Sequence, residues 1–334
     1  MRIAFLVQGV DAARTRYRIL QYLPFFRDSE VDARVFDVPR GMWAKRRLFA
    51  AMDQYDVVLI QKRLFGDRDF ALLREKANRL IFDVDDAVME KLDDSFRKRK
   101  RRRSNFERTV KECDLVFAGN AYLEKIVHDL GAPAVRVPTC VDLARYPVRK
   151  EIPRAPEDFS IKIGWIGSRS NLPYLEALKP VFLELGQSGI PLELHIICDT
   201  FFDLEGLPVI KKIWGLDTEV HDLMELDIGL APLPDNRWTR GKSATKIVQY
   251  MAAGMPVICS PVGANAEIVR DGVDGLHAET HQDWLNKLFY LLEYPEVRIR
   301  MGRAGRMRVE EFYSVQANFP ILYGALMDLC GCER

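Results

Sequence analysis

The chemistry that this sequence suggests first is phosphate binding, because Gly241, Lys242 and Ser243 match the end of a nucleotide-triphosphate P-loop. Such a loop also needs a glycine five positions before its Gly-Lys pair, and Asn236 occupies that position. The P-loop interpretation therefore fails. The segment must serve another arrangement that places backbone amides beside a lysine.

A helix N-terminus at the end of a parallel strand fits the segment better. We expect a helix over Ala244–Ala253, with Ser243 as its N-cap, after a strand over Asp227–Leu233 and a polar loop. The first amides and the macrodipole of such a helix favour an anion, and a diphosphate is the anion we expect. The residues assigned to it are Arg240, Lys242, Ser243, Ala244, Thr245 and Lys246. The alternative, a serine that only caps and lysines that are solvated, stays open.

Both halves of the chain have the pattern of a doubly wound α/β domain. Nearly continuous apolar runs of strand length alternate with helical periodicity, as a parallel sheet covered on both faces requires. We expect strands at Arg2–Val7, Ala33–Val38, Asp56–Gln61, Arg79–Val84, Asp114–Gly119, Ser160–Gly167, Leu192–Cys198, Asp227–Leu233 and Pro256–Ser260. Further helices are expected at Leu172–Leu185 and Glu219–Leu226.

A charged, proline-rich stretch without periodicity, Pro147–Pro156, predicts a linker. We therefore expect two Rossmann-like domains, residues 1–150 and 151–314. The last helix, Val315–Leu329 within residues 315–334, is expected to pack across their junction. Ligands of such sheets bind at the carboxyl ends of the strands, so an active site is expected in a cleft between the domains.

The composition is typical of a globular protein, since 48% of the 334 residues are hydrophobic and 29% are charged. The opening apolar run is too short for a secretion signal or a membrane span, so we expect a cytoplasmic protein. The net charge of +1 conceals an asymmetry. Residues 1–150 hold 31 basic and 22 acidic side chains, whereas the remainder holds 18 and 26. That difference predicts different partners for the two halves.

The sequence from Gln249 to Ile258, QYMAAGMPVI, resembles the donor-binding signature of the GT-B glycosyltransferases of family 4, also called group 1. The stretches Ser260–Gly263 and Glu267–Val269 continue the match. Other matching stretches are Arg16–Arg18, Gln21–Tyr22, Phe82–Ala87, Gly164–Ser168 and Asp271–Glu279.

This resemblance implies a GT-B fold and a hexosyltransferase-type enzyme. The enzyme would move a sugar from a nucleotide diphosphate-sugar, of the UDP or GDP type, to an acceptor hydroxyl with retention of configuration. It would need neither a metal ion nor another cofactor, and none of the five histidines has a metal-ligand spacing. The implied role is the synthesis of cell-surface polysaccharide or glycolipid. The second domain would hold the donor, and the first domain would hold a glycan, a lipid-linked or a small-molecule acceptor.

The sequence departs from the family pattern at three positions. The family carries two glutamates eight residues apart, where this chain has Gly241 and Gln249. Gln249 can still hydrogen-bond the ribose, but the contact of the first glutamate with the donor sugar has no carboxylate here. Trp165 stands where the family usually has an arginine, and the nearest substitute is Arg169, beside Gly167 and Ser168. A solvated loop arginine is the alternative for Arg169.

Catalysis by such an enzyme requires stabilisation of the leaving diphosphate. Amides at Ser243–Thr245 with Lys242 and Lys246 would supply it, so Lys246 is predicted to be catalytic. On the acceptor side, Asp85 and Asp86 end a strand and could accept or position the acceptor proton, or they could only cap the next helix. The predicted sugar or phosphate contacts are Gly9, Arg14, Arg16 and Asn120.

Two basic amphipathic stretches, Gly41–Met52 and Phe96–Arg108, predict peripheral binding to an anionic membrane surface on its inner face. A solvated helix face is the alternative, and nucleic acid is disfavoured because no aromatic stacking platform accompanies the charges. Two further functions stay open for the whole chain. One is a sugar-nucleotide epimerase of the same architecture, and the other is a non-catalytic nucleotide-sugar-binding protein. The sequence specifies neither the base, the sugar, the acceptor nor the oligomeric state.

Overall fold

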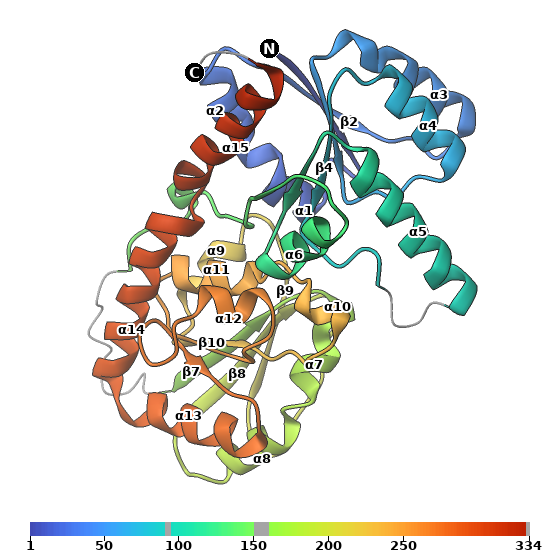
Figure 1. Ribbon diagram of the computed structural model, residues 1–334. Coiled ribbons are helices and arrows are strands. Elements are labelled where there is room, and N and C mark those ends of the chain that lie inside the picture. Colours follow the sequence, from blue (N-terminus) through green and yellow to red (C-terminus); the bar gives the residue numbers. More distant parts are fainter. Residues whose placement is uncertain (91–94, 150–159, 332–334) are drawn as a thin grey trace. The chain divides into compact units, whose positions relative to one another are not determined.

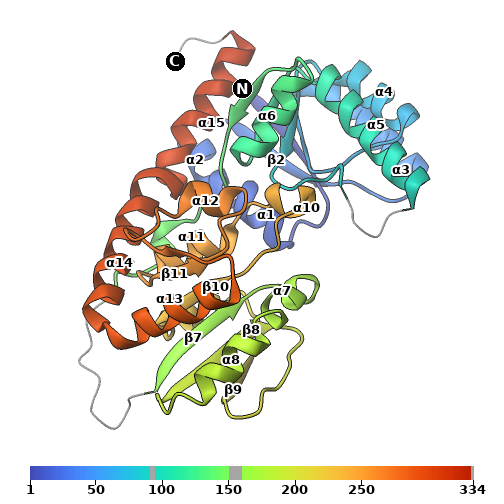
Figure 2. The ribbon, with the colours of Figure 1, turned by 60° about the horizontal axis from the view of Figure 1, so that its bottom comes forward.

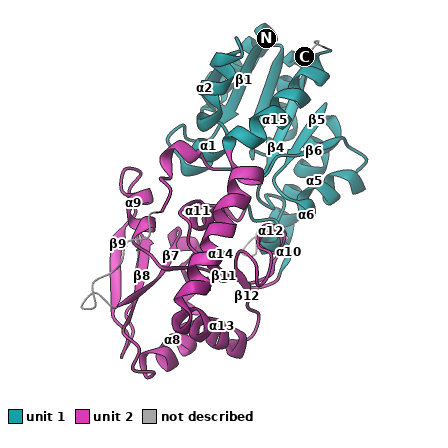
Figure 3. Ribbon diagram, turned by 90° about the vertical axis from the view of Figure 1, so that its left-hand side faces the viewer, with its two compact units in different colours: residues 1–140, 236–243, 315–334 teal, residues 141–235, 244–314 magenta. Residues whose placement is uncertain are grey.

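The computed structural model describes residues 1–90, 95–149 and 160–331, and the chain divides into two compact units (Figure 3). Unit 1 contains residues 1–140, 236–243 and 315–334, and unit 2 contains residues 141–235 and 244–314. The division follows Cys140 and not residue 150. The segment 236–243 and the last helix also join unit 1. Most of the predicted linker Pro147–Pro156 lies outside the described residues.

Unit 1 is built on a six-stranded parallel sheet in the order β2-β1-β3-β4-β5-β6. Its central strands are buried along their whole length, which explains their continuous apolar sequences. The strands are β1 (Arg2–Val7), β2 (Asp32–Asp37), β3 (Val57–Gln61), β4 (Leu80–Val84), β5 (Leu115–Ala118) and β6 (Ala134–Arg136).

Helices cover both faces of this sheet (Figure 1). Helices α2 (Leu23–Asp28) and α15 (Val315–Cys330) share a hydrophobic core with Ile3 and Phe5 of β1. The alternate residues of β1 face the core of the remaining helices, because side chains alternate along a strand. Those helices are α3 (Met42–Ala50), α4 (Asp67–Lys76), α5 (Phe96–Glu112) and α6 (Ala121–Asp129). Short helices α1 (Ala13–Arg18), η1 (Leu20–Tyr22), η2 (Ala51–Gln54) and α10 (Arg237–Arg240) complete unit 1.

Unit 2 repeats the architecture with a second six-stranded parallel sheet, in the order β12-β11-β10-β7-β8-β9. Each strand is followed by a chain segment that crosses over to the next parallel strand, as the βα alternation predicts. The strands are β7 (Ile161–Ile166), β8 (Leu192–Cys198), β9 (Val209–Ile213), β10 (Ile228–Ala231), β11 (Val257–Cys259) and β12 (Leu276–His277).

The main core of unit 2 lies between this sheet and a helical layer that includes α8 (Lys179–Gly186), which lies over β8 in Figure 2. The same layer contains α7 (Leu172–Glu176), α13 (His281–Glu293) and α14 (Pro295–Arg308). On the other face, α11 (Thr245–Ala252) packs on β10, where the ring of Tyr250 fills the space that Gly229 leaves. The remaining elements are η3 (Leu143–Arg145), η4 (Arg169–Asn171), α9 (Glu219–Met224), α12 (Ala264–Ile268) and the π-helical turn η5 (Val309–Tyr313).

The structure differs from the sequence prediction mainly where elements are short or exposed. The expected helix Leu172–Leu185 is two helices, α7 and α8, and Pro180 lies in the first turn of the second, where its missing N–H costs nothing. Strand β9 was not predicted, because its exposed lysines interrupt the apolar pattern. Strands β6 and β12 and helix α10 have four residues or fewer, which is too short for a periodicity to appear.

Candidate functional site

The N-terminus of α11 in unit 2 is the predicted anion site, and its cap differs from the prediction. The N-cap is Ala244 and not Ser243, and the helix begins at Thr245. Ala244 is buried and has φ 51° and ψ 27°, the left-handed conformation. A left-handed residue followed by right-handed ones directs successive backbone amides into one concavity that suits an anion. The macrodipole adds positive potential at the same end.

Lys246 lies in the first turn of α11, above the indole ring of Trp165. The Lys246 Nζ atom is 4.2 Å from the ring centroid, which is the geometry of a cation–π contact. Trp165 is fully buried near the end of β7. Gly167 follows it, and a Cβ atom at Gly167 would lie 2.5 Å from the Cζ2 and Cη2 atoms of the indole. Of the predicted donor residues, the structure thus brings Lys246 and Gly167 together around one aromatic ring.

Arg169 and Ser168, also predicted to bind the donor, lie just beyond β7. Both side chains are exposed, Arg169 in the turn η4 and Ser168 as the residue before it. The Ser168 hydroxyl is 3.0 Å from the Ser170 hydroxyl and accepts a hydrogen bond from Asn171 at 3.1 Å. The structure therefore gives Ser168 a local role in the turn, and an exposed Arg169 at the end of the strand.

Gln249, the residue predicted to contact the ribose, is buried and only 4% exposed. Its side-chain amide donates a hydrogen bond to the Tyr146 hydroxyl at 3.4 Å. A buried amide that donates to a tyrosine hydroxyl is restrained in its orientation. The ribose contact stays a prediction.

Tyr250 is a site residue that the sequence reasoning missed. Its hydroxyl accepts a hydrogen bond from the Ile166 amide at 2.9 Å and donates one to the Leu230 carbonyl at 3.2 Å. Burial raises the pKa of Tyr250, so the hydroxyl stays protonated as this donation requires. Tyr250 thereby fastens α11 to β7 and β10 at once. Its signal in the sequence is an aromatic residue one helical turn after Lys246, within the family signature.

The segment 236–243 folds as part of unit 1 and carries three of the predicted donor residues, Arg240, Lys242 and Ser243. Asn236 caps α10 through a capping box with Thr239. The Asn120 side chain, which also caps α6, donates hydrogen bonds to the carbonyls of Arg240 and Lys242 at 3.3 and 3.1 Å. These contacts of Asn120 hold the segment in place, and its predicted contact with the acceptor stays a prediction.

Gly241 explains why a carboxylate is missing from this segment. A Cβ atom at Gly241 would lie 2.5 Å from the Cβ and 2.8 Å from the backbone N of Ala87. Real Cβ atoms do not approach backbone atoms so closely, so no side chain fits unless the backbone moves. The position of the family's first glutamate is therefore closed to any larger residue by the loop that follows β4.

Asp85 and Asp86 follow β4 and share one cation, Lys62, which the sequence reasoning also missed. The Lys62 Nζ atom is 2.7 Å from Asp85 Oδ1 and 2.7 Å from Asp86 Oδ2. Asp85 is buried, whereas Asp86 is partly exposed. Lys62 has φ 55°, a left-handed conformation that is uncommon for residues other than glycine. Its only signal in the sequence was a lysine directly after the strand.

Lys242 lies near this group of charges. Burial lowers the pKa of Lys242, Asp86 acts in the opposite direction, and the neighbouring Lys62 ammonium lowers it further. Its Nζ atom is also 5.2 Å from the ring centroid of Trp238. Two lysines and two aspartates of unit 1 therefore lie close together near the carboxyl ends of β3 and β4, namely Lys62, Lys242, Asp85 and Asp86.

The end of β1 carries Gly9, Arg14 and Arg16, which were predicted to contact a sugar or phosphate. Gly9 has φ +84° and its amide donates to Asp37 Oδ1 at 3.0 Å, while its carbonyl accepts from the Thr15 hydroxyl. Arg14 donates to the carbonyl of Gln8, and the Arg16 guanidinium lies over the Tyr17 ring at 4.4 Å. These contacts give the three residues structural roles at the carboxyl end of β1.

Arg18 and Asp83 form a buried ion pair in unit 1 that the sequence did not predict. Arg18 Nε donates to Asp83 Oδ2 at 3.1 Å, and Arg18 Nη1 donates to the Val137 carbonyl at 2.6 Å. Burial opposes the charge of Arg18, but the Asp83 carboxylate outweighs it and the pKa of Arg18 is raised. The pair joins α1 to β4 across a long sequence separation.

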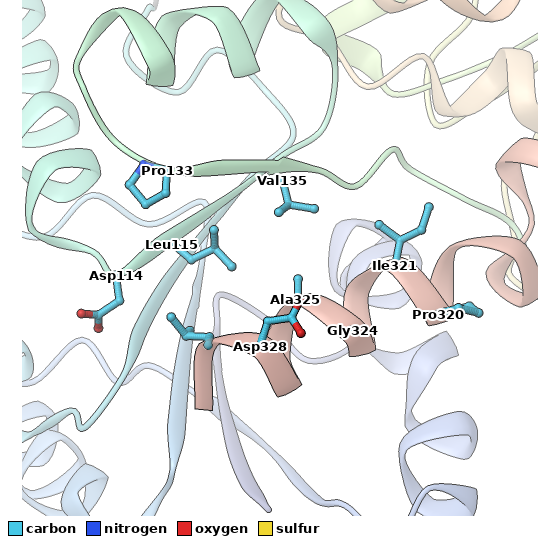
Figure 4. Close-up of a pocket in the computed structure, with 10 residues that line it drawn as sticks. Asp114, Leu115, Pro133, Val135, Pro320, Ile321, Gly324, Ala325 and Asp328 are labelled. Carbon is cyan, nitrogen blue, oxygen red and sulfur yellow. The ribbon is translucent and has the colours of Figure 1, made fainter. Parts of the chain in front are cut away.

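A groove of about 620 Å³ lies at the opposite edge of the same sheet, where β5 and β6 begin. Figure 4 shows Leu115 and Val135 on one side of it, and Ile321 and Ala325 of α15 on the other. Its lining is mostly apolar, and none of the predicted site residues belongs to it. The groove is therefore separate from the carboxyl ends of the strands.

Two further observations concern metal ligands and membrane-spanning helices. Among the residues that the structure describes, no three His, Cys, Asp or Glu side chains are grouped as metal ligands. In the same residues, no helix is both long enough and apolar enough to cross a membrane.

Comparison with known proteins gives one family and many similar folds. Residues 238–308, from α10 to the end of α14, match the family model described as Glycosyl transferases group 1. No curated protein matches the chain. Sucrose-phosphate synthase from Thermosynechococcus elongatus is similar in structure, with a TM-score of 0.72 and 14% identity over 98% of this chain and 99% of that one.

Two other solved structures are similar in fold. HepE from Anabaena, in complex with UDP and glucose, has a TM-score of 0.66 and 14% identity over 97% of this chain and 99% of that chain. A putative UDP-N-acetylglucosamine 2-epimerase from Listeria monocytogenes has a TM-score of 0.60 and 12% identity over 100% and 98%. The predicted GT-B fold is confirmed, and the predicted resemblance to group 1 is confirmed over residues 238–308.

Proposed function

We propose that this enzyme moves a sugar from a nucleotide diphosphate-sugar, with UDP or GDP as the nucleotide, to an acceptor hydroxyl with retention of configuration. The observation that carries the proposal is the group 1 segment, because within it the N-terminus of α11 has a left-handed cap and a lysine in its first turn. The UDP found with HepE supports a nucleotide-sugar donor.

The proposed chemistry places the diphosphate at the N-terminus of α11. Negative charge grows on the diphosphate as the glycosidic bond breaks, so groups that are already oriented toward it lower the barrier. The concavity after Ala244, the macrodipole and the Lys246 ammonium supply positive potential there. These positive groups support a reaction without a metal ion. We expect the turnover to be unchanged by EDTA and not to increase when Mg²⁺ is added.

Calorimetry with UDP, GDP and their sugars tests the donor site. We expect one nucleotide series to bind, and Lys246→Ala to weaken that binding by about 1–3 kcal/mol because a charge-assisted contact is lost. Lys287→Ala, on α13, is the matched control and should leave the dissociation constant unchanged. A dissociation constant that Lys246→Ala does not alter would remove Lys246 from the phosphate site.

For the acceptor, we propose that Asp86 receives or orients the reacting hydroxyl. It is the more exposed of the two paired aspartates, and Lys62 fixes its carboxylate. We expect Asp86→Asn to lower kcat while the nucleotide dissociation constant stays the same. Equal losses in nucleotide binding and in turnover would instead assign Asp86 to folding or to the donor.

A sugar-nucleotide epimerase is the second candidate, and the structural similarity to the Listeria protein is the observation that favours it. Such an enzyme needs no separate acceptor. Incubation with the nucleotide sugar alone, followed by sugar analysis, separates the two reactions. Epimerised sugar without an acceptor would replace the transferase proposal. If nucleotides bind but no sugar is transferred or epimerised, the chain is a binding protein whose Gly241 and Gln249 replace two carboxylates.

We further propose that unit 1 binds an anionic membrane surface through α3 and the first turns of α5, as a lipid-linked acceptor for polysaccharide or glycolipid synthesis would require. Residues 97–103 are seven consecutive basic side chains at the N-terminal end of α5, where the macrodipole and the neighbouring cations both oppose them. Anionic lipid would offset that repulsion by about 1 kcal/mol per basic residue near the surface. Phe96 is 77% exposed and Trp43 on α3 is 76% exposed, as membrane-interface aromatics are.

Co-sedimentation with lipid vesicles tests this surface. We expect the protein to bind vesicles that contain phosphatidylserine, to ignore pure phosphatidylcholine, and to dissociate as salt rises. Trp43→Ser should weaken binding, whereas Ile213→Ser, which removes an equally exposed side chain from β9, should not. Binding without a preference for anionic vesicles would overturn the proposal.

A further inference from the structure

The contact between Lys246 and Trp165 has a property that an ordinary ion pair would lack. An aromatic ring attracts a cation through its quadrupole and carries no negative charge of its own. The ring therefore limits the position of the ammonium group without neutralising its charge and without accepting from its N–H donors through a lone pair.

The ring itself is fixed from several sides. Its outer edge faces the space kept open by Gly167, where a Cβ atom would lie 2.5 Å from two ring carbons. Its other contacts are in the main core of unit 2, together with residues of α7, α8 and α13. Trp165 is 0% exposed, so the indole has no freedom to turn away from Lys246.

The helix that carries Lys246 is fixed to the strand that carries Trp165. Tyr250 lies one helical turn after Lys246, and its hydroxyl accepts from the amide of Ile166, the residue next to Trp165. The same hydroxyl donates to the Leu230 carbonyl. The ammonium and the indole face are thus placed by the backbone of β7 and by α11, and not by flexible loops.

The indole N–H indicates what the tryptophan is for. Trp165 Nε1 is buried and has no hydrogen-bond acceptor among the described residues. An unsatisfied buried donor is unfavourable, and phenylalanine at this position would avoid that cost. The property that tryptophan offers over phenylalanine is a stronger cation-binding face.

We infer that Trp165 is a positioning residue that holds the Lys246 ammonium at the N-terminal turn of α11, ready for the diphosphate of the donor. This inference rests on the proposed donor site. Trp165 is not expected to touch the nucleotide, because its side chain is fully buried under Lys246. Its effect on nucleotide binding should therefore depend on the presence of Lys246.

The test is calorimetry with UDP and GDP on the wild type, Trp165→Leu, Trp165→Phe, Lys246→Ala and the double variant Trp165→Leu/Lys246→Ala. We expect Trp165→Leu to weaken nucleotide binding about 3- to 10-fold and Trp165→Phe to weaken it less, because phenylalanine retains a weaker aromatic face. In the Lys246→Ala background, Trp165→Leu should cause no further loss. Equal, additive losses in both backgrounds would overturn the inference.

Trp284→Leu is the matched control for packing. Trp284 belongs to the same core and is 3% exposed, on α13. We expect thermal unfolding to show similar destabilisation by Trp284→Leu and Trp165→Leu, with nucleotide affinity lowered only by the latter. If both lower the affinity equally, packing explains the effect and the inference fails. If Lys246→Ala itself binds nucleotide like the wild type, the proposed donor site fails, which is a different result.

Discussion

The carboxyl ends of the two sheets have the same architecture but opposite electrostatic arrangements. In unit 1 the charges that directly follow β3 and β4 are paired with one another, Lys62 with Asp85 and Asp86. In unit 2 the corresponding edge has a helix N-terminus, a left-handed cap and Lys246 above an aromatic ring. One edge holds a lysine between two carboxylates, whereas the other holds a lysine at a helix N-terminus.

The difference teaches how one fold serves two kinds of ligand. Paired charges hold each other in place and contribute little net potential, which suits the positioning of a neutral hydroxyl group. An anion such as a diphosphate is instead attracted by the positive potential that a helix N-terminus supplies. The contrast between the two edges therefore supports the proposed division into an acceptor unit and a donor unit.

The largest expected effect comes from breaking the buried ion pair of unit 1. Arg18→Met leaves the Asp83 carboxylate buried without its cation, and we expect urea unfolding to show a loss of about 3–5 kcal/mol. The double variant Arg18→Met/Asp83→Leu should recover most of that loss, because no buried charge remains. A single variant as stable as the wild type would show that this edge does not depend on pairing.

A smaller loss is expected from Lys62→Met, which leaves Asp85 and Asp86 without their shared cation. We expect the free energy of unfolding to fall by about 2–4 kcal/mol, since Asp85 is buried and Asp86 is partly exposed. Lys62→Arg keeps the charge and should be closer to the wild type. Equal stability of the Met and Arg variants, measured by urea unfolding, would contradict the role of the ion pairs.

Gly241→Glu restores the carboxylate of the family pattern, yet we expect it to reduce stability by about 1–3 kcal/mol and to raise no activity. The reason is the contact with Ala87, which leaves no room for a Cβ atom. Gly66→Glu is the control, because a Cβ atom there meets nothing within 4 Å. Thermal unfolding and turnover measure the two effects, and a stable, faster Gly241→Glu enzyme would contradict this explanation.

The smallest effect concerns pH and the interior of the second sheet. Burial lowers the pKa of His195 on β8, and Glu193 only partly offsets this. As the pH falls, His195 takes up a proton near pH 6.5 in the unfolded chain and only at a lower pH in the folded protein. The free energy of unfolding should therefore decrease as the pH drops below about 6.5. His195→Gln should reduce the decrease of the unfolding free energy below this pH. His128→Gln is the control, because His128 is exposed, and it should leave that pH dependence unchanged. An unchanged slope in His195→Gln would assign the pH dependence to other groups.

The strands were predictable because fully buried parallel strands leave continuous apolar runs, and β1 and β8 have the predicted bounds. The cap of α11 was not predictable, since Ser243 has the better capping side chain and the left-handed Ala244 is set by tertiary structure. The pair Arg18–Asp83 was hidden for another reason. Its partners are 65 residues apart, and no local pattern relates them.

A change of composition along the sequence also could not predict that one unit is made of separate segments. Composition changes along a sequence, so it suggests one cut near residue 150. The structure instead gives residues 236–243 to unit 1, because Asn120 and Ala87 contact that segment. The predicted cleft between the domains and the roles of Lys242 and Arg240 at the diphosphate stay predictions.

The discontinuous make-up of unit 1 has a consequence for how the protein is synthesised. Helix α15 completes the cover of one face of the first sheet through Val315, Leu322 and Leu326, so that face stays partly uncovered until these residues have been synthesised. Unit 2 completes its own segments earlier, by residue 314. The unit that starts first therefore finishes last, and a fragment cut near residue 150 would expose the apolar surface that α15 covers, which favours aggregation.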